Sequence, residues 1–188
     1  MKIGIFGGCF NPPHNMHKKI GMDLIEKGYL DKVIYVPTGD RYQKKDLVSA
    51  MDRYNMVSLM IEDYPNLLVS DYELMNNLTY TYQTLEYFKN IYPNDEIHFI
   101  CGSDNLLQIT TWVNYHYILD NFKLLVIMRN NDTIKDLIYQ YPNIIESDIC
   151  MDSLSSTVIR DELYKDSSSD NVCDKVLKYI KEKNLYMI

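Results

Sequence analysis

Short, nearly continuous apolar runs alternate along this chain with longer segments whose apolar residues recur at helical spacing. Runs such as HFICG and LLVIM suit strands that are buried on both faces of a parallel sheet. Alternation of such strands with helices predicts a doubly wound α/β fold, with helices on both faces of the sheet. Because ligands on such sheets bind beyond the carboxyl ends of the strands, we expect the chemistry to lie in the loops that follow the strands.

The pattern predicts six strands and eight helices within one domain, 1–188, with no repeat and no linker. The expected strands are Lys2–Phe6, Lys32–Pro37, Leu67–Ser70, Ile97–Cys101, Lys123–Met128 and Asn143–Ile145. The expected helices are Met16–Lys27, Ala50–Tyr64, Tyr80–Ile91, Asp104–Gln108, Asn114–Leu119, Ile134–Tyr141, Ser156–Lys165 and Val172–Lys183. A chain of this length can bury a full hydrophobic core.

Charge and composition narrow the classes of function. The formal net charge is −7, which argues against binding to nucleic acid or to an anionic membrane surface. No run of eighteen apolar residues predicts a membrane span, and the apolar start is too short for a signal peptide, so we expect a cytoplasmic protein. The four cysteines form no CxxC pair and match no zinc spacing, which favours free thiols.

The segment after the first expected strand reads GGCFNPPHNMH. Gly7 and Gly8 let the backbone approach a ligand closely, and Pro13 delays the following helix. His14 and His17 are three residues apart at that helix start, so both rings can donate an N–H to a phosphate beside the helix amides.

Other interpretations of this segment are weaker but open. The segment is neither the G-x-G-x-x-G dinucleotide fingerprint nor a P-loop. A zinc site at His14 and His17 lacks a third ligand nearby. A tight turn carrying two ordinary surface histidines also fits.

A second motif, SSTVIR, lies near the other end of the chain. Its serines predict a helix N-cap, and Ser156 and Arg160 are four residues apart and share a helix face. Hydroxyls, helix amides and one guanidinium would converge there on phosphate oxygens. The alternative is a plain capped helix with a surface arginine.

Together the two motifs resemble the HxGH nucleotidyltransferase superfamily, whose patterns are GGxFDPxHxGH and ISSTxIR, in the same chain order. Asn11 stands where these adenylyltransferases commonly have Asp, and Met16 stands where the motif has Gly. Met16 continues a row with Ile20 and Leu24, so we expect its side chain to turn to the core.

Segments between the motifs are similar to the nicotinate mononucleotide adenylyltransferases of bacteria. Leu78–Leu85 resembles their SYTxxTL stretch, Ile100–Asn105 their IIGxDxL strand end and Thr111–Trp112 their TW or KW pair, and Arg129 alone matches their RRPG. Pro37–Lys45 instead resembles the PxxDxYxKK loop of eukaryotic-type nicotinamide mononucleotide adenylyltransferases.

The resemblance implies a Rossmann-like fold and transfer of AMP from ATP to nicotinate mononucleotide, with Mg²⁺ accompanying ATP and pyrophosphate released. It implies catalytic roles for His14, His17 and Arg160. For ATP it implies contacts from Gly7, Gly8, Phe10, Gly102, Asp104, Ser156, Thr157 and Arg160. For the mononucleotide it implies contacts from Lys44, Tyr80, Thr81, Trp112 and Arg129. No residue is expected to bind a metal directly.

Three alternatives stay open: a nicotinamide or dual-specificity enzyme, another HxGH enzyme such as a pantetheine-phosphate adenylyltransferase or a cytidylyltransferase, and a nucleotide-binding module without catalysis. The sequence also leaves open whether the chain forms a homo-oligomer.

Overall fold

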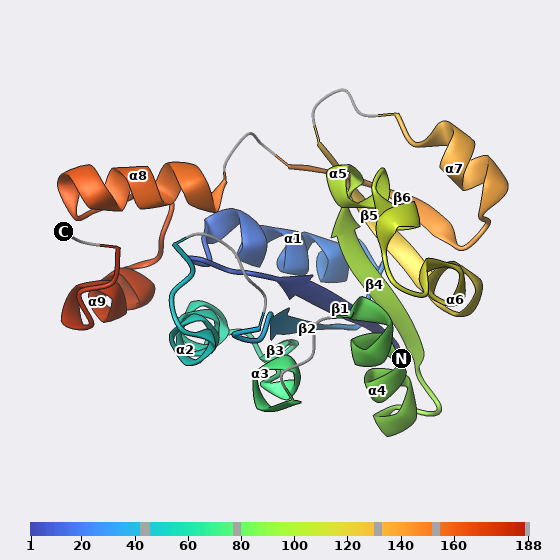
Figure 1. Ribbon diagram of the computed structural model, residues 1–188, viewed down its shortest axis with the longest axis horizontal. Helices are drawn as coiled ribbons and strands as arrows, with labels where there is room; N and C mark the ends of the chain where they lie inside the picture. The colour runs from blue at the N-terminus through green and yellow to red at the C-terminus, as the bar shows by residue number, and fades with distance from the viewer. Residues whose placement is uncertain (42–45, 77–79, 130–132, 152–154, 187–188) are drawn as a thin grey trace.

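The computed structural model describes residues 1–41, 46–76, 80–129, 133–151 and 155–186. Their centre is a six-stranded parallel sheet in the order β3-β2-β1-β4-β5-β6 (Figure 1). The strands are β1 (Lys2–Gly8), β2 (Lys32–Pro37), β3 (Leu67–Val69), β4 (Glu96–Gly102), β5 (Lys123–Arg129) and β6 (Ile144–Met151). The expectation of a doubly wound, Rossmann-like sheet is confirmed.

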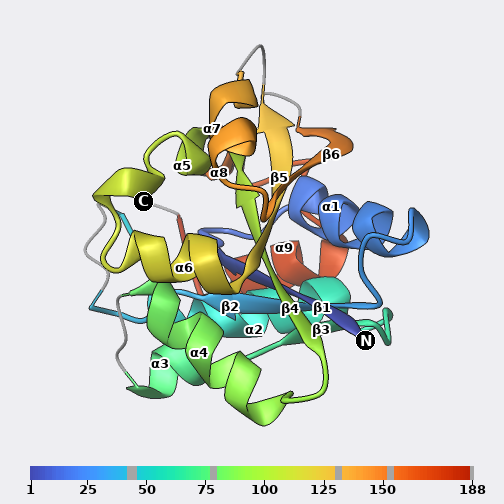
Figure 2. The same cartoon turned by 90° about the vertical axis from the view of Figure 1, so that its right-hand side faces the viewer.

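Helices cover both faces of this sheet (Figure 2). They are α1 (Asn15–Glu26), α2 (Ala50–Ile61), α3 (Tyr72–Asn76), α4 (Thr81–Ile91), α5 (Ser103–Leu106), the 3₁₀ turn η1 (Ile109–Thr111), α6 (Tyr115–Asn121), α7 (Lys135–Gln140), α8 (Ser156–Asp166) and α9 (Asp174–Glu182). Successive strand residues point to opposite faces, and this produces two separate apolar cores.

One core lies between the sheet and α1, α2, α8 and α9, and the other between the sheet and α4 and α6. In β5, Leu125 and Ile127 belong to the first core, whereas Leu124 and Val126 belong to the second. The continuous apolar runs of the sequence therefore reflect burial on both faces, as expected.

Several element bounds differ from the sequence-based prediction for identifiable reasons. β1 continues through both glycines, because Gly7 and Gly8 pair with the end of β2. α2 ends at Ile61 rather than Tyr64, because the residue before Pro65 is disfavoured in a helix. The α9 helix begins at Asp174, two residues after the expected start.

β6 is much longer than the predicted Asn143–Ile145. Glu146 and Ser147 interrupt its apolar pattern, and they lie at an irregularity in the pairing with β5. The hydroxyl of Ser147 donates to the carbonyl oxygen of Val126 at 2.8 Å. The strand therefore bridges the irregularity through a side chain and continues to Met151.

The order of the strands reverses at the boundary between the neighbouring strands β1 and β4. Strands that follow β1 in sequence build outward through β2 and β3, and β4 returns to the other side of β1. This reversal is the switch point at which doubly wound sheets bind their ligands.

Candidate active site

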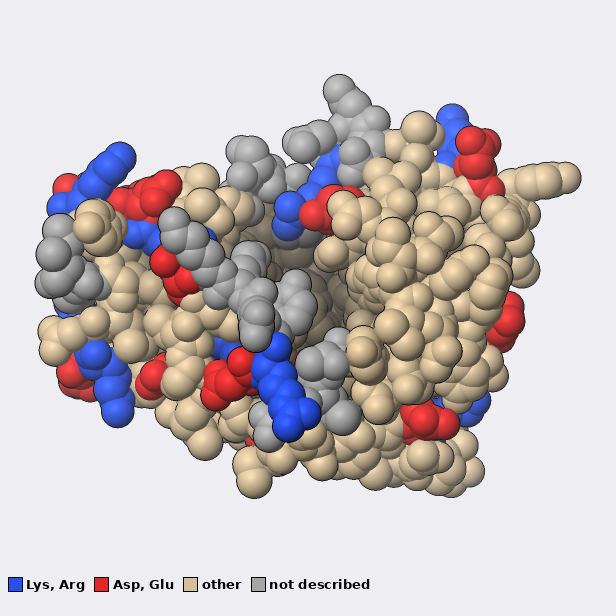
Figure 3. Space-filling model, in the orientation of Figure 1, with Lys and Arg blue, Asp and Glu red and all other residues tan. Residues whose placement is uncertain are grey.

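A cavity of about 660 Å³ opens beyond the carboxyl ends of β1 and β4. Figure 3 shows a hollow near the middle of the molecule in this view. The volume is within the range of pockets that hold cofactor-sized ligands. Except for Lys44, every residue for which a site role was expected lines this one cavity; Lys44 lies outside the described residues.

The β1–α1 loop, residues 9–14, forms one wall of the cavity. Its carbonyl oxygens are bound by side chains from distant elements: Cys9 by Arg53 at 3.0 Å, Asn11 by Arg160 at 2.8 Å and Pro12 by Ser156 at 3.0 Å. Because these acceptors are already satisfied by the protein, the wall presents few free oxygens to the cavity. Such a wall suits an anionic ligand.

Phe10 anchors the middle of the loop. It is buried, and its backbone adopts a left-handed conformation with φ 47°. Its ring meets that of His17 edge to face at a centroid distance of 5.0 Å and that of Tyr35 at 5.8 Å. Tyr35 in turn donates its hydroxyl hydrogen to the carbonyl oxygen of His17 at 2.9 Å. This aromatic packing fixes the start of α1 against the sheet.

The two histidines lie against each other at the start of α1. Burial lowers the pKa of His14 to about 4, helped by the positive charge of Arg129. Burial, with the neighbouring His14 and Arg129, also holds the pKa of His17 well below its ordinary value. Both rings are therefore neutral at neutral pH.

A hydrogen bond determines which nitrogen of His17 carries the proton. The backbone N–H of His14 donates to Nδ1 of His17 at 3.2 Å. A neutral ring whose Nδ1 accepts must be protonated at Nε2. His17 therefore offers an N–H donor to the cavity. Nδ1 of His14 is buried and has no hydrogen-bond partner among the described residues.

Helix α8 brings the second motif to the same wall. The Ser155 side chain caps it by accepting from the N–H of Val158 at 3.4 Å, as the sequence predicted. Arg160 also reaches the Thr157 hydroxyl at 3.3 Å. In this structure the hydroxyl hydrogen of Ser156 is donated to the β1–α1 loop, so Ser156 positions that loop while lining the cavity.

The end of β4 supplies the adjoining wall. A Cβ on Gly102 would lie 2.4 Å from Oδ1 of Asp104, so only glycine fits there without displacing that carboxylate. Asp104 forms an ion pair with Arg129 at 3.4 Å. Oδ1 of Asp104 and Nε of Arg129 are buried without a hydrogen-bond partner among the described residues, while both side chains line the cavity.

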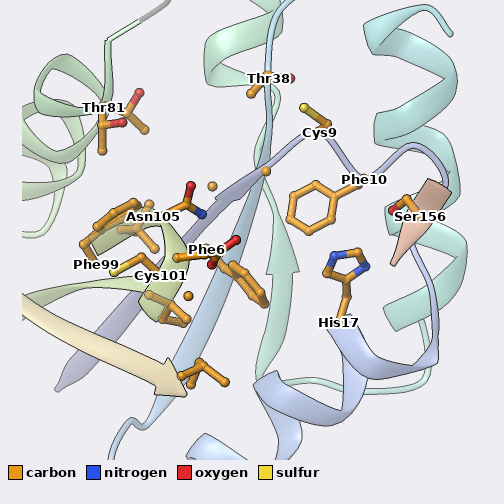
Figure 4. Close-up of a pocket in the computed structure, with 18 of the residues that line it drawn as sticks. Phe6, Cys9, Phe10, His17, Thr38, Thr81, Phe99, Cys101, Asn105 and Ser156 are labelled. Atoms are coloured by element: carbon orange, nitrogen blue, oxygen red, sulfur yellow. The ribbon is translucent and has the colours of Figure 1, made fainter. Parts of the chain in front are cut away.

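The far end of the cavity is aromatic. The Trp112 ring meets Phe99 edge to face at 5.9 Å and is partly exposed. Thr81, the first residue of α4, and Tyr80 also line the cavity. Figure 4 shows His17, Phe10 and Ser156 on one side of the cavity and Thr81, Phe99 and Asn105 on the other.

Two buried charged residues of this region were not singled out from the sequence. Arg53 of α2 is completely buried and donates to Val48 O, Cys9 O and both oxygens of Thr38. Glu73 of α3 lines the cavity and accepts from the Thr84 hydroxyl at 2.7 Å. Burial raises the pKa of Glu73 to about 7, opposed by Thr84 and Arg53. Neither residue belongs to a recognisable motif.

Met16 does not enter the cavity. Its side chain packs against the core shared by α1 and α2, so the expectation drawn from its row with Ile20 and Leu24 is confirmed. The bulk of Met16 therefore leaves the cavity side of the β1–α1 loop unobstructed.

The described residues contain no group of three or more His, Cys, Asp or Glu side chains arranged to hold a metal ion. The zinc alternative for His14 and His17 consequently gains no third ligand in this part of the chain. No helix within these ranges combines the length and apolar character needed to cross a membrane.

Comparison with known proteins agrees with this geometry. Residues 5–162 match the family model described as cytidylyltransferase-like. A protein of Clostridium tetani named "Probable nicotinate-nucleotide adenylyltransferase" is 34% identical, covering 98% of each chain. One of the same name from Caldicellulosiruptor bescii is 38% identical over 99% of each chain.

A solved structure shares the fold. The nicotinic acid mononucleotide adenylyltransferase of Plasmodium falciparum complexed with NaAD superposes with a TM-score of 0.84 at 23% identity, covering 98% of this chain and 97% of that one. The chain therefore belongs to the cytidylyltransferase-like family and, within it, to the nicotinate-nucleotide adenylyltransferases.

Proposed function

We propose that this protein transfers AMP from ATP to nicotinate mononucleotide, producing nicotinate adenine dinucleotide and pyrophosphate in NAD biosynthesis. The observation that carries the proposal is the continuity of one cavity. Its one end is lined by His14, His17 and Arg160, and its other by Thr81 and Trp112. A nucleoside triphosphate and a pyridine mononucleotide can therefore meet within a single cavity.

The triphosphate would occupy the end beside α1 and α8. Arg160 supplies the positive charge there, and Nε2 of His17 supplies a neutral donor. A neutral imidazole costs less to bury than a charged one, and it still donates to an oxygen on which negative charge grows. We assign His17 to the α-phosphate, Arg160 and Thr157 to the β- and γ-phosphates and His14, which also lines the cavity, to the same triphosphate.

The adenosine would lie over the ends of β1 and β4. Gly7 and Gly8 remove side-chain bulk at the end of β1, and Gly102 does the same at the end of β4. Phe10 would pack against the nucleotide, and Asp104, which lines the cavity, would accept from its polar groups.

The pyridine ring would stack at the aromatic end, on Trp112. Helix α4 begins at Thr81 and has no acidic residue in its first turn, so its free N–H groups and positive end favour a carboxylate. That preference supports nicotinate over nicotinamide as the substituent. Arg129 and Lys44 are proposed for the mononucleotide's phosphate.

The chemical step needs no covalent intermediate with the protein. A phosphate oxygen of the mononucleotide attacks the α-phosphorus of ATP in line, the new P–O bond forms, and the bond to the β-phosphate oxygen breaks. Pyrophosphate leaves with that electron pair. The chain contributes by aligning the two phosphates and stabilising the charge that develops on the α-phosphate.

Magnesium fits this site only as a companion of ATP. The described residues form no metal cage, and Mg²⁺ commonly keeps several waters and binds through substrate phosphates. When bound, it would neutralise charge on the departing pyrophosphate.

The test is pyrophosphate release from ATP and Mg²⁺, with nicotinate mononucleotide and nicotinamide mononucleotide assayed side by side. We expect turnover with the acid to exceed turnover with the amide. Equal turnover would instead establish dual specificity. ATP binding without pyrophosphate release from either substrate would overturn the proposal in favour of another acceptor or a binding module.

A further inference from the structure

The side chain of Asn11 is a junction between three distant parts of the chain. It is 2% exposed. Its Nδ2 donates to the carbonyl oxygen of Asp46 at 2.8 Å, and its Oδ1 accepts from the N–H of Val48 at 3.2 Å. Its Oδ1 also accepts from the hydroxyl of Tyr186 at 2.7 Å. Both lone pairs of that oxygen are thereby used.

Tyr186 reaches this junction from beyond α9, where its ring packs against the core shared by α1, α2, α8 and α9. Burial raises the pKa of its phenol, with Arg160 and Arg53 opposing the shift. The hydroxyl therefore remains a donor at any pH at which the protein functions. The contact between Tyr186 and Asn11 does not titrate.

The junction adjoins the proposed triphosphate site. Asn11 lines the cavity, is adjacent to Phe10 and precedes His14 by three residues. Its backbone carbonyl receives Arg160. A shift of Asn11 would consequently move the histidine end of the β1–α1 loop and the guanidinium together.

We propose that Tyr186 is a positioning residue for adenylyl transfer, holding the β1–α1 loop in register with Arg160 through the side chain of Asn11. The proposal rests on the proposed reaction but assigns a role to a residue outside both motifs. It also explains the amide at position 11. An aspartate would place a carboxylate oxygen against the Asp46 carbonyl, where Nδ2 now donates.

The primary experiment compares Tyr186→Phe with Tyr179→Phe. Tyr179 is a matched control in α9, because its hydroxyl donates to Asp52 at 2.8 Å and accepts from Asn55 at 3.0 Å, and neither partner belongs to the β1–α1 loop. Both changes remove only a hydroxyl, so both rings keep their packing. Thermal unfolding of each variant establishes that any kinetic difference does not come from loss of fold.

For Tyr186→Phe we expect kcat/KM for ATP to fall about five-fold, the factor that one buried neutral hydrogen bond typically contributes. The loss should appear in kcat and in ATP affinity measured by calorimetry, while the KM for the mononucleotide changes less than about two-fold. Tyr179→Phe should keep wild-type kinetics. Equal kinetic constants and ATP affinities in the two variants would overturn the proposal.

A double-mutant cycle tests whether Tyr186 acts through Asn11. In an Asn11→Ala background, Tyr186→Phe should have little further effect, because the acceptor is already gone. Fully additive losses would show that Tyr186 acts elsewhere. Failure of the proposed reaction is distinguishable, because the wild type would then release no pyrophosphate while calorimetry would still compare the ATP affinities of the two tyrosine variants.

Discussion

The ring of His14 stacks on the ring of His17, with centroids 3.7 Å apart and planes inclined by 29°. Two positive charges at that separation in a buried site would repel strongly. The stack is therefore stable only while at least one ring is neutral. This requirement makes both the activity and the stability of the protein sensitive to acid.

Replacement of His17 by alanine should lower turnover by about 10²–10³-fold, the usual effect of removing one donor to developing charge. The measurement is steady-state pyrophosphate release at saturating ATP and mononucleotide. His116→Ala is the matched control, since His116 is exposed on α6 and does not line the cavity. Near-normal turnover of His17→Ala would refute the assignment of His17 to the α-phosphate.

The free energy of unfolding should fall as the pH drops below about 6.5, because His14 and His17 bind protons in the unfolded state but stay neutral in the folded state. The pKa of folded His14 is about 4, so its contribution is lost between about pH 6.5 and that value, at about 1.4 kcal/mol per pH unit. In urea unfolding across this pH range, the free energy of unfolding of the double variant His14→Gln/His17→Gln should rise relative to that of the wild type as pH falls. A difference in unfolding free energy that is independent of pH would contradict the neutral pair.

Glu73 has the opposite pH dependence. Its folded pKa of about 7 lies above the ordinary 4.5, so the unfolded state releases this proton first and stability declines as pH rises from about 4.5 to 7. Glu73→Gln keeps the acceptor for Thr84 and removes the charge. Its unfolding free energy relative to wild type should improve by about 3 kcal/mol between pH 4.5 and pH 8. Glu86→Gln, on the surface of α4, serves as the control for the substitution itself.

Arg53→Met should destabilise the protein by at least about 3 kcal/mol, because it leaves the carbonyl oxygens of Cys9, Thr38 and Val48 without their donor, each at a cost of about 1–3 kcal/mol. Chemical denaturation measures the loss. The exposed Arg41 offers a control, and Arg41→Met should stay within about 0.5 kcal/mol of wild type. A small effect for Arg53→Met would mean that water replaces the guanidinium.

The sequence predicts the sheet well, because a strand that is buried on both faces is an uninterrupted run of apolar residues. Such a run can be recognised from consecutive residues alone. The sequence does not predict elements whose extent depends on tertiary contacts. Helix α3 has five residues, too few for helical periodicity to emerge, and β6 is extended past Glu146 and Ser147 only by its pairing with β5.

The same limit applies to the site. The expected residues within the described ranges gather at one cavity because strand-end loops converge in a parallel sheet. Arg53, Glu73 and Tyr186 could not be foreseen. Each is a polar side chain whose burial depends on partners that are distant in the sequence. The spacing of neighbouring residues gives no information about such partners. The sequence shows Asn11 only as a departure from the family pattern. Its contact with Tyr186 can be seen only in the folded structure.

The carbonyl oxygens of the β1–α1 loop are bound by groups from positions 53, 156 and 160, and its Asn11 side chain by position 186. Positions 156, 160 and 186 each lie more than 140 residues after the part of the loop that they bind. Because β6 ends at Met151, a nascent chain can assemble all six strands before these three partners have been synthesised. A fragment that stops before α8 would therefore lack three of the groups that hold this loop in place.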